Sequence, residues 1–306
     1  MGQNAIPQQT PNTPFRKGGL RGIGSKGRRG AIWTARVRLA DRGLRDSWAL
    51  FMESRIGVLG LAIIVLFALM AIAHPILMGT VWDDATFNPV TGYASDQLQQ
   101  PAPPSRQHLL GTDPLGRDVL SQLMSGTASA FILGILAAVV TVIIATIVGA
   151  VAAYYGGAVD TLFMRLADLI IMLPTISLLI VLTALFDLNF FQLALVLGVL
   201  GGFGGATIIL KSQALSIKVK PYIEAARVAG GGPFHLIFVH IVPNLLPLSL
   251  LYMMFTVTGA IFSEAVLSFF GILNIRMSWG IMIHTANTGG YLLGGTKYWW
   301  LILPAG

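Results

Sequence analysis

The sequence predicts an all-α polytopic membrane protein, and three observations support this fold class. Hydrophobic residues make up 55% of the chain and charged residues only 11%, whereas soluble domains carry about 25% charged residues. The mean hydropathy is +0.74. Several apolar runs also reach the length of about 18 residues that a membrane-spanning helix needs.

We expect five complete spans and the start of a sixth, because each of these runs contains few or no charges. The five complete spans are predicted at residues 56–78, 128–153, 162–186, 188–210 and 241–262. Residues 298–306 begin a further apolar run. Nine helical residues rise only about 14 Å, which is less than the roughly 30 Å thickness of the hydrocarbon core. We therefore expect the chain to end in a half-inserted segment, or to be shorter than the functional protein.

The distribution of lysine and arginine predicts a cytoplasmic N-terminus. Residues 1–56 contain eleven Lys/Arg and three Asp/Glu, a charge of +8, while the whole chain carries +7. The remainder therefore sums to about −1, too little for a nucleic-acid groove. Residues 79–127 have two Lys/Arg against five aspartates, as expected for an extracytoplasmic loop. Residues 211–227 have four Lys/Arg against one glutamate, as expected for a cytoplasmic loop.

Composition and motif spacing exclude several kinds of site. The chain has no cysteine, which rules out disulfides, thiolate metal ligands and cysteine nucleophiles. The five histidines show no ligand spacing such as HExxH, so no metal site is expected. The glycine-rich residues 198–205 lack the strand context and the Gly-Lys-Ser/Thr ending of a phosphate-binding loop. Their small-residue spacing favours close helix packing instead, within the chain or against a partner. The residues assigned to this packing are Gly198, Gly202 and Gly205.

Ionisable residues near the expected spans are costly unless they are paired or hydrated. Arg165 and Asp168 lie three apart, so they share a helix face and are predicted to form a structural ion pair rather than a proton relay. Glu264 lies near the end of the fifth span without a nearby basic residue. Two roles stay open for it, contact with a transported substrate or a hydrogen bond to a loop.

A further group of charges precedes the second span. Paired carboxylates with an arginine are compatible with acid–base chemistry. The Asp-Pro sequence at residues 113–114 favours a turn, however, so we predict an ion pair that orders the loop. The residues concerned are Asp113, Arg117 and Asp118.

A short polar segment, residues 221–243, separates two long apolar runs. Pro221 suits the first turn of a helix, where an acidic residue is also favoured by the helix dipole. The alanines allow a second protein's backbone to approach closely, and the glycines that follow permit a sharp reversal. The segment therefore predicts a short helix parallel to the membrane, with an ordinary interfacial turn as the alternative. Its candidate contact residues are Glu224, Ala225, Ala226, Gly230 and Pro243.

This segment resembles the cytoplasmic coupling loop of ABC-importer permeases, the membrane subunits that receive force from a separate ATPase. Three other segments resemble the dipeptide, oligopeptide and nickel branch of that family: residues 108–120 (HLLGTDPLGRDVL), 155–168 and 263–280. Together they extend the resemblance over residues 55–304. The single leading span and long first extracytoplasmic loop look like the C-type permease subunit. His240 and Val242 depart from the general pattern, which has isoleucine and leucine there.

The resemblance implies a type I ABC-importer transmembrane fold in a bacterial or archaeal inner membrane. It implies that this chain forms half of a pathway for peptides and catalyses nothing. The implied partners are a second permease subunit, two ATP-binding subunits and an extracytoplasmic solute-binding protein. ATP and magnesium would bind those ATP-binding subunits, and this chain would need no cofactor. The alternatives are a permease for nickel chelates or other small solutes, or a secondary transporter driven by an ion gradient.

The expected organisation follows from these features. Residues 31–55 mix apolar and basic side chains and are predicted to form an amphipathic helix on the inner membrane surface. A solvated helix leading into the first span is the alternative. The predicted parts are a disordered basic cytoplasmic tail (1–30), the interfacial helix (31–55), the first span (56–78), an extracytoplasmic loop (79–127) and a core permease domain (128–306) with its coupling loop (213–240).

Overall fold

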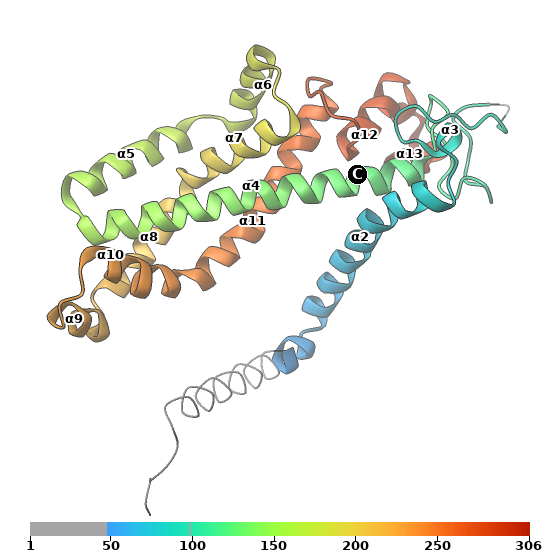
Figure 1. The fold of residues 1–306 in the computed structure, drawn as a ribbon. Helices are drawn as coiled ribbons and strands as arrows, with labels where there is room; N and C mark the ends of the chain where they lie inside the picture. Colours follow the sequence, from blue (N-terminus) through green and yellow to red (C-terminus); the bar gives the residue numbers. More distant parts are fainter. Residues whose placement is uncertain (1–47, 98) are drawn as a thin grey trace, which may run out of the picture. The chain divides into compact units, whose positions relative to one another are not determined.

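The computed structural model describes residues 48–97 and 99–306, and helices form nearly all of their regular structure (Figure 1). Apart from one isolated bridge between Thr112 and Asp118, the described residues contain no β-structure. The predicted all-α architecture is therefore confirmed. The elements are α2 (Arg55–Thr80), α3 (Asp84–Phe87), α4 (Val119–Tyr155), α5 (Gly157–Met172), α6 (Thr175–Phe186), α7 (Phe190–Gly202), α8 (Gly205–Lys218), α9 (Pro221–Val228), α10 (Pro233–His235), the π-helix η1 (Leu236–Ile241), α11 (Val242–Phe269), α12 (Trp279–Thr288), the 3-10 helix η2 (Tyr291–Tyr298) and α13 (Trp299–Ile302).

The chain divides into two units, Met1–Ile63 and Ile64–Gly306. In the first unit, the predicted tail and residues 31–47 of the predicted interfacial helix lie outside the described residues. Residues 48–53 are helical, and the helix is interrupted at Ser54 before α2 begins. All the sites considered below lie in the second unit.

Among the described residues, three helices are long and apolar enough to cross a membrane: α2, α4 and the continuous helical stretch Pro233–Phe269. Two bent pairs, α5 with α6 and α7 with α8, raise the number to five if each pair is one span. By length and composition, the structure thus offers five candidates for the five predicted complete spans. Two of the candidates are bent helix pairs, whereas uninterrupted helices were expected.

The two bends have local causes. The axes of α5 and α6 differ by 85°. Pro174 lacks a backbone N–H and disfavours helix in the residue before it, and Leu173 is accordingly extended (φ −79°, ψ 128°). The axes of α7 and α8 differ by 42°. Glycine is a poor helix former, and this break falls at Gly204 within the glycine-rich residues 198–205.

Helix α4 is the central element of the second unit, and α7, α8 and α11 pack along it (Figure 1). Its 37 residues span about 55 Å. Small side chains permit close packing between helices in a membrane. A Cβ added at Gly134 would lie 3.0 Å from Val257 of α11, and one at Gly149 would lie 2.9 Å from the backbone of α8. These glycines let α11 and α8 approach α4 closely.

Helix α4 begins at Val119 rather than near residue 128, where the second span was expected. Asp118 caps its N-terminus, because its Oδ1 accepts a hydrogen bond from the Ser121 amide at 2.7 Å. Capping by aspartate satisfies one of the free N–H groups at a helix start. The last nine residues of the predicted loop 79–127 are therefore helical.

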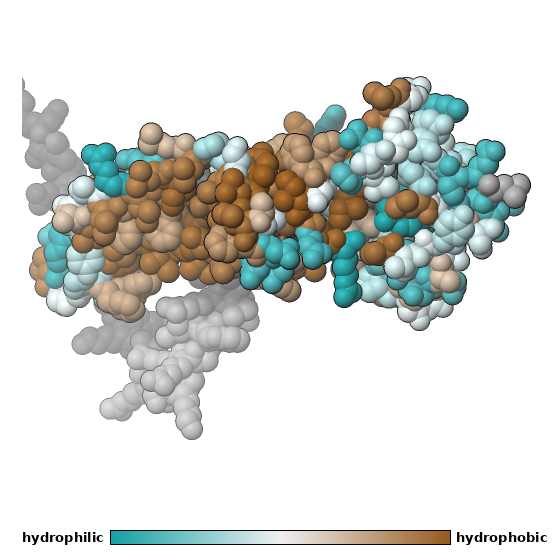
Figure 2. Space-filling view, turned by 90° about the horizontal axis from the view of Figure 1, so that it is seen from above, coloured by the Kyte–Doolittle hydropathy of each residue, from teal (hydrophilic) through white to brown (hydrophobic). Residues whose placement is uncertain are grey.

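Most of the exposed large apolar side chains of the second unit lie on its helices, as expected for a surface in contact with lipid. Figure 2 shows these side chains as a broad brown area, with polar residues gathered at the end of the molecule where α3 and residues 88–118 lie in Figure 1. The exposed surface thus changes from apolar to polar toward the N-terminal end of α4.

Candidate coupling helix and cavities

Helix α9 is short, amphipathic and built from local signals. Lys220 is its extended N-cap, and Pro221 occupies the first turn, where a missing N–H costs no hydrogen bond. Gly230 (φ 91°) ends the segment, in a backbone region that favours glycine. The Gly231 amide donates to the Ala226 carbonyl at 2.9 Å. The predicted short helix with a glycine break is therefore present in the structure at residues 221–230.

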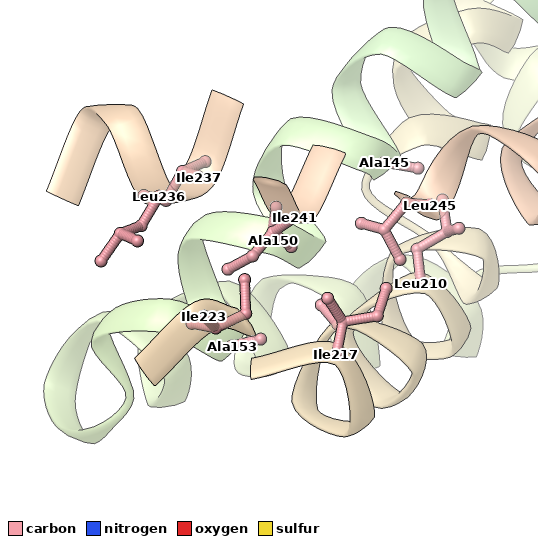
Figure 3. Close-up of a cluster of buried hydrophobic side chains, with 11 residues drawn as sticks. Ala145, Ala150, Ala153, Leu210, Ile217, Ile223, Leu236, Ile237, Ile241 and Leu245 are labelled. Carbon is pink, nitrogen blue, oxygen red and sulfur yellow. The ribbon is translucent and has the colours of Figure 1, made fainter. Parts of the chain in front are cut away.

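Ile223 anchors α9 to the rest of the unit. Its side chain is fully buried, and it is the one buried residue of this helix. Figure 3 shows Ile223 among side chains from α4, α8, η1 and α11. We call this set the α9 cluster. Its buried members are Ala145, Ala150, Ala153, Leu210, Ala214, Ile217, Ile223, Leu236, Ile237, Ile241 and Leu245.

The opposite side of α9 is exposed. Glu224, Ala225 and Gly230 are all exposed, and Ala226 is half-buried against the α9 cluster. Pro243, the fifth predicted residue, lies exposed in the first turn of α11 rather than on α9. Large apolar side chains around α9 are exposed as well. They are Val219, Tyr222, Val228 and Phe234.

The sequence analysis treats Arg227 only as a positive charge of a cytoplasmic loop, but in the structure this residue forms an ion pair with Glu224. Its Nη1 donates to Glu224 Oε2 at 2.8 Å. Both side chains are well exposed, so the pair contributes little stability. The spacing of three residues on one helix could have revealed it.

Two lysines near α9 tie neighbouring helix ends together, and sequence reasoning missed both contacts. Lys218 Nζ donates to the carbonyl oxygens of Ala153 and Tyr154, at 2.9 and 2.8 Å. These carbonyls belong to the last turn of α4, where a cation is favoured by the helix dipole. Lys211 Nζ lies 2.5 Å from Asp160 Oδ1, which joins α8 to α5.

A π-helical segment connects α9 to α11. Residues Leu236–Ile241 form η1, and three of its members belong to the α9 cluster. π-helical segments are uncommon and are frequently found at functional sites. α11 continues directly from η1 as far as Phe269. The buried side of α9 therefore contacts the start of a long continuous helix.

A cavity of about 500 Å³ lies beside the two helix bends. Its lining is mostly apolar, and Thr175, Thr256 and Ser263 bring hydroxyl groups to it. Among the described residues, no charged side chain lines it. The lining residues are Ile170, Ile171, Leu173, Thr175, Leu178, Leu197, Leu200, Gly201, Gly204, Gly205, Thr256, Gly259, Ala260, Phe262 and Ser263.

Glu264, the residue considered for contact with a substrate, is buried and does not line this cavity, although Ser263 beside it does. The Ser268 hydroxyl donates to Glu264 Oε1 at 2.6 Å. Next to this residue, α12 packs tightly on α11, since a Cβ added at Gly280 would lie 2.2 Å from the Ala265 carbonyl. This hydrogen bond stays within α11 and does not reach a loop, so both predicted roles of Glu264, the contact with a loop and the contact with cargo, stay predictions.

The three glycines assigned to helix packing differ in their surroundings. A Cβ added at Gly198 would lie 2.6 Å from Val140, and one at Gly202 would lie 2.7 Å from Ile144. Both neighbours belong to α4. An added Cβ at Gly205 would meet nothing within 4 Å. The structure thus brings the first two to the α4–α7 contact and leaves Gly205 in open space beside the cavity.

The predicted pair of Arg165 and Asp168 lies on α5 with Nη1 and Oδ2 3.8 Å apart. The side chains are 79% and 52% exposed. This separation and exposure describe a weak surface contact rather than a buried ion pair.

The charges that precede α4 form two connected groups. Arg117 Nε donates to Asp113 Oδ2 at 2.7 Å, and Gln122 Nε2 donates to the same oxygen at 2.9 Å. His108 Nδ1 lies 2.8 Å from Asp118 Oδ2, and His108 Nε2 lies 3.2 Å from Asp96 Oδ1. Within the described part of the chain, no group of histidines and carboxylates suits a metal ion.

The two aspartates beside His108 differ in their ionisation. Burial raises the pKa of Asp118, against the opposing effect of hydrogen bonds from the Ser121 amide and from His108. Burial also acts to raise the pKa of Asp96, but hydrogen bonds from Gln97 and His108 outweigh it, and the pKa is lowered. The scattered spacing of the histidines in the sequence does not predict these contacts, because His108 lies ten residues from Asp118 and twelve from Asp96.

Known proteins resemble the chain over most of its length. The model of the family "Binding-protein-dependent transport system inner membrane component" matches residues 145–304. The "N-terminal TM domain of oligopeptide transport permease C" matches residues 44–104. Both matches confirm the resemblance to C-type permeases. Together with the apolar helices, they also confirm the fold class, that of a multi-pass inner membrane permease.

Three curated relatives support the same assignment. The oligopeptide transport system permease protein OppC of Bacillus subtilis (strain 168) is 34% identical, covering 86% of this chain and 82% of the relative. The dipeptide transport system permease protein DppC of the same organism is 32% identical, covering 85% and 78%. The OppC protein of Escherichia coli (strain K12) is 33% identical, covering 90% and 87%. The chain therefore belongs to the family of binding-protein-dependent transport system inner membrane components.

Proposed function

We propose that this chain is a permease subunit of an ATP-driven, binding-protein-dependent importer of peptides. The observation that supports this function best is α9, a helix with one fully buried side chain and a mostly exposed surface. The oligopeptide and dipeptide names of the relatives support peptide as the cargo. A second permease subunit, two ATP-binding subunits and a solute-binding protein complete the importer. ATP and magnesium bind the ATP-binding subunits.

Helix α9 lies on the cytoplasmic side in this proposal, together with the N-terminus of the chain. The basic residues around α9 favour that orientation, because loops rich in Lys/Arg remain inside. Ala225 is small and exposed, so a cleft of an ATP-binding subunit can approach the backbone of α9. Glu224, Ala226 and Gly230 belong to the same contact, and Pro243 supports it from the first turn of α11.

Force passes from α9 to the membrane helices through the α9 cluster. Displacing α9 moves Ile223, which packs with the buried residues of η1 at the start of α11. α11 in turn lines the cavity of about 500 Å³ with residues between Thr256 and Ser263. Packed elements of this kind move as rigid bodies between discrete arrangements. Closure of the ATP-binding subunits thereby changes the shape of the cavity through which peptide passes.

The proposal is tested by blocking the approach to α9. The chain is expressed with its genomic neighbours, and wild type is compared with Ala225→Arg and with the control Ala85→Arg. Ala85 is also exposed but lies in α3, near the N-terminal end of α4. We expect Ala225→Arg to lose copurification of the ATP-binding subunits and ATP-dependent peptide uptake, while Ala85→Arg keeps the copurification. Uptake that needs an ion gradient and no ATP would contradict the proposal.

A further inference from the structure

A second cavity, of about 380 Å³, lies at the far end of α4 from α9. Ser129 of α4 lines it, whereas Ala153 of α4 belongs to the α9 cluster. Twenty-four helical residues separate these positions by about 36 Å. Three segments distant in sequence meet at the cavity: α4, the start of α7, and the loop at residues 271–278. The side chains that matter here are Ser129, Asn189, Phe190, Phe191, Asn274 and Arg276.

Unlike the larger cavity, this one is lined by a positively charged side chain, that of Arg276. Arg276 lines it and is exposed, and among residues 48–97 and 99–306 no carboxylate oxygen lies within 4.0 Å of its guanidinium. By contrast, Arg117, Lys211 and Arg227 all have carboxylate partners. A guanidinium presents two parallel N–H groups that match the two oxygens of a carboxylate.

The loop that presents Arg276 is fixed on both sides. Leu273 and Met277 are buried, and Asn274 and Arg276 between them are exposed. This alternation directs the polar side chains outward from a packed base. After the loop, the Ser278 hydroxyl accepts a hydrogen bond from the Ile281 amide and caps α12. The loop that carries Arg276 is therefore anchored by buried side chains and by the helix cap that follows it.

The amide groups at the cavity suit a peptide backbone. Asn189 caps α7, and its Oδ1 accepts a hydrogen bond from the Gln192 amide at 3.0 Å. Its Nδ2 is thus left to donate. Asn274 supplies a second exposed amide. Phe190 and Phe191 add apolar surface beside these groups, so a carboxylate, an amide and an apolar side chain can all be accommodated in one small volume.

We infer that this cavity binds the C-terminal carboxylate of the peptide, with Arg276 as the group that recognises it. The inference rests on the proposed function, which has the peptide arrive on the side opposite α9. Phe190, Leu197 and Gly201 follow at helical spacing on α7, and the last two line the larger cavity. The two cavities thus lie along one face of α7, about 17 Å from Phe190 to Gly201, and this face is the route that we assign to the peptide. Arg276 holds the peptide's carboxylate at the outer end of this route.

The test compares two forms of one peptide in the complete importer, with its binding protein and ATP-binding subunits, in vesicles of neutral lipid. One form has a free C-terminal carboxylate and the other a C-terminal amide. ATP-dependent uptake of each is measured for wild type, for Arg276→Gln and for the control Arg106→Gln, an exposed arginine outside the cavity. Preference of the binding protein for either peptide cancels, because each peptide is compared with itself across the variants.

We expect Arg276→Gln to lower uptake of the free-acid peptide about tenfold and uptake of the amidated peptide less than twofold. Arg106→Gln should leave both within twofold of wild type. Asn274→Asp is the second variant, because a carboxylate beside Arg276 would compete with that of the peptide. It should also lower uptake of the free acid selectively, and Arg276→Lys should recover part of that uptake.

An equal loss of both peptides in Arg276→Gln would overturn this inference. An effect seen only when anionic phosphatidylglycerol is added would assign Arg276 to a lipid headgroup and overturn it too. Failure of the wild-type importer to take up either peptide would instead contradict the proposed peptide function itself. The two failures are therefore distinguishable.

Discussion

Lys218 closes the C-terminal end of α4, since its Nζ donates to the Tyr154 carbonyl oxygen at 2.8 Å. A second hydrogen bond to Ala153 completes the contact. The two partners are 64 residues apart in the sequence, so the interaction fixes α8 against α4 just before α9 begins. The position of α9 therefore depends on a capped helix end as well as on apolar packing.

Replacing Lys218 by methionine should destabilise the protein by about 1–2 kcal/mol. The substitution keeps the apolar stem but removes the cation from two carbonyls at the negative end of a helix. Thermal unfolding of the purified protein in detergent measures the effect. Lys220→Met is the matched control, because Lys220 is exposed and has no carboxylate within 4.0 Å among the described residues. Equal changes in both variants would show that the hydrogen bonds of Lys218 are not responsible.

Ile223→Ala should separate ATP hydrolysis from transport. The substitution removes the one buried side chain of α9 and should cost about 2–5 kcal/mol of local packing. We expect the ATP-binding subunits still to associate, because the exposed surface of α9 is unchanged. ATP hydrolysis should continue while peptide uptake falls at least tenfold.

Val81→Ala is the control for Ile223→Ala, since Val81 is also an apolar side chain but is 74% exposed and lies outside α9. Uptake by this variant should stay close to that of wild type. Normal coupling in Ile223→Ala would mean that force does not pass through the α9 cluster.

Much of this architecture could be predicted from the sequence because its signals are local. Pro221, Glu224 and Gly230 are within ten residues of one another, and they specify a short helix with a glycine end. The apolar runs likewise predict helices that cross a membrane. Residue type and spacing are sufficient at this scale.

The remaining features depend on contacts between distant segments. Pro174 predicts a helix break, but the 85° angle between α5 and α6 depends on what those helices pack against. Nothing in the sequence distinguishes Ile223 from the other isoleucines, and its burial follows from packing against α4, α8 and η1. Arg276 is a single charge in the sequence, and only the fold brings Asn189 to the same cavity.

Gly198→Ala should lower the stability of the protein, whereas Gly205→Ala should not. A Cβ at Gly198 would lie 2.6 Å from Val140, so α7 would be forced away from α4 at a cost of about 1–3 kcal/mol. At Gly205 nothing lies within 4 Å, and alanine favours helix over glycine by up to about 1 kcal/mol. Thermal unfolding should therefore show a lower midpoint for Gly198→Ala and an unchanged or higher one for Gly205→Ala. A lower midpoint for both would contradict the packing difference.

Asp118 and Asp96 should contribute to stability with opposite pH dependence. The pKa of Asp118 is raised in the folded state, so its contribution is present below its ordinary value of 3.8 and is lost as the pH rises through the higher folded value. The pKa of Asp96 is lowered, so its contribution is present above 3.8 and is lost as the pH falls through the lower folded value. Both aspartates contact the same histidine, yet burial dominates for one and hydrogen bonds for the other.

Asp118→Asn and Asp96→Asn distinguish these two effects, because asparagine keeps the shape of the side chain and does not titrate. Thermal unfolding between about pH 3 and pH 6 is measured for wild type and both variants. The advantage of wild type over Asp118→Asn should shrink as the pH rises across this range, and its advantage over Asp96→Asn should grow. If the two differences change in the same direction, the ionisation assigned to this loop is wrong. His108 would then hold the two carboxylates in a different way from the one its contacts indicate.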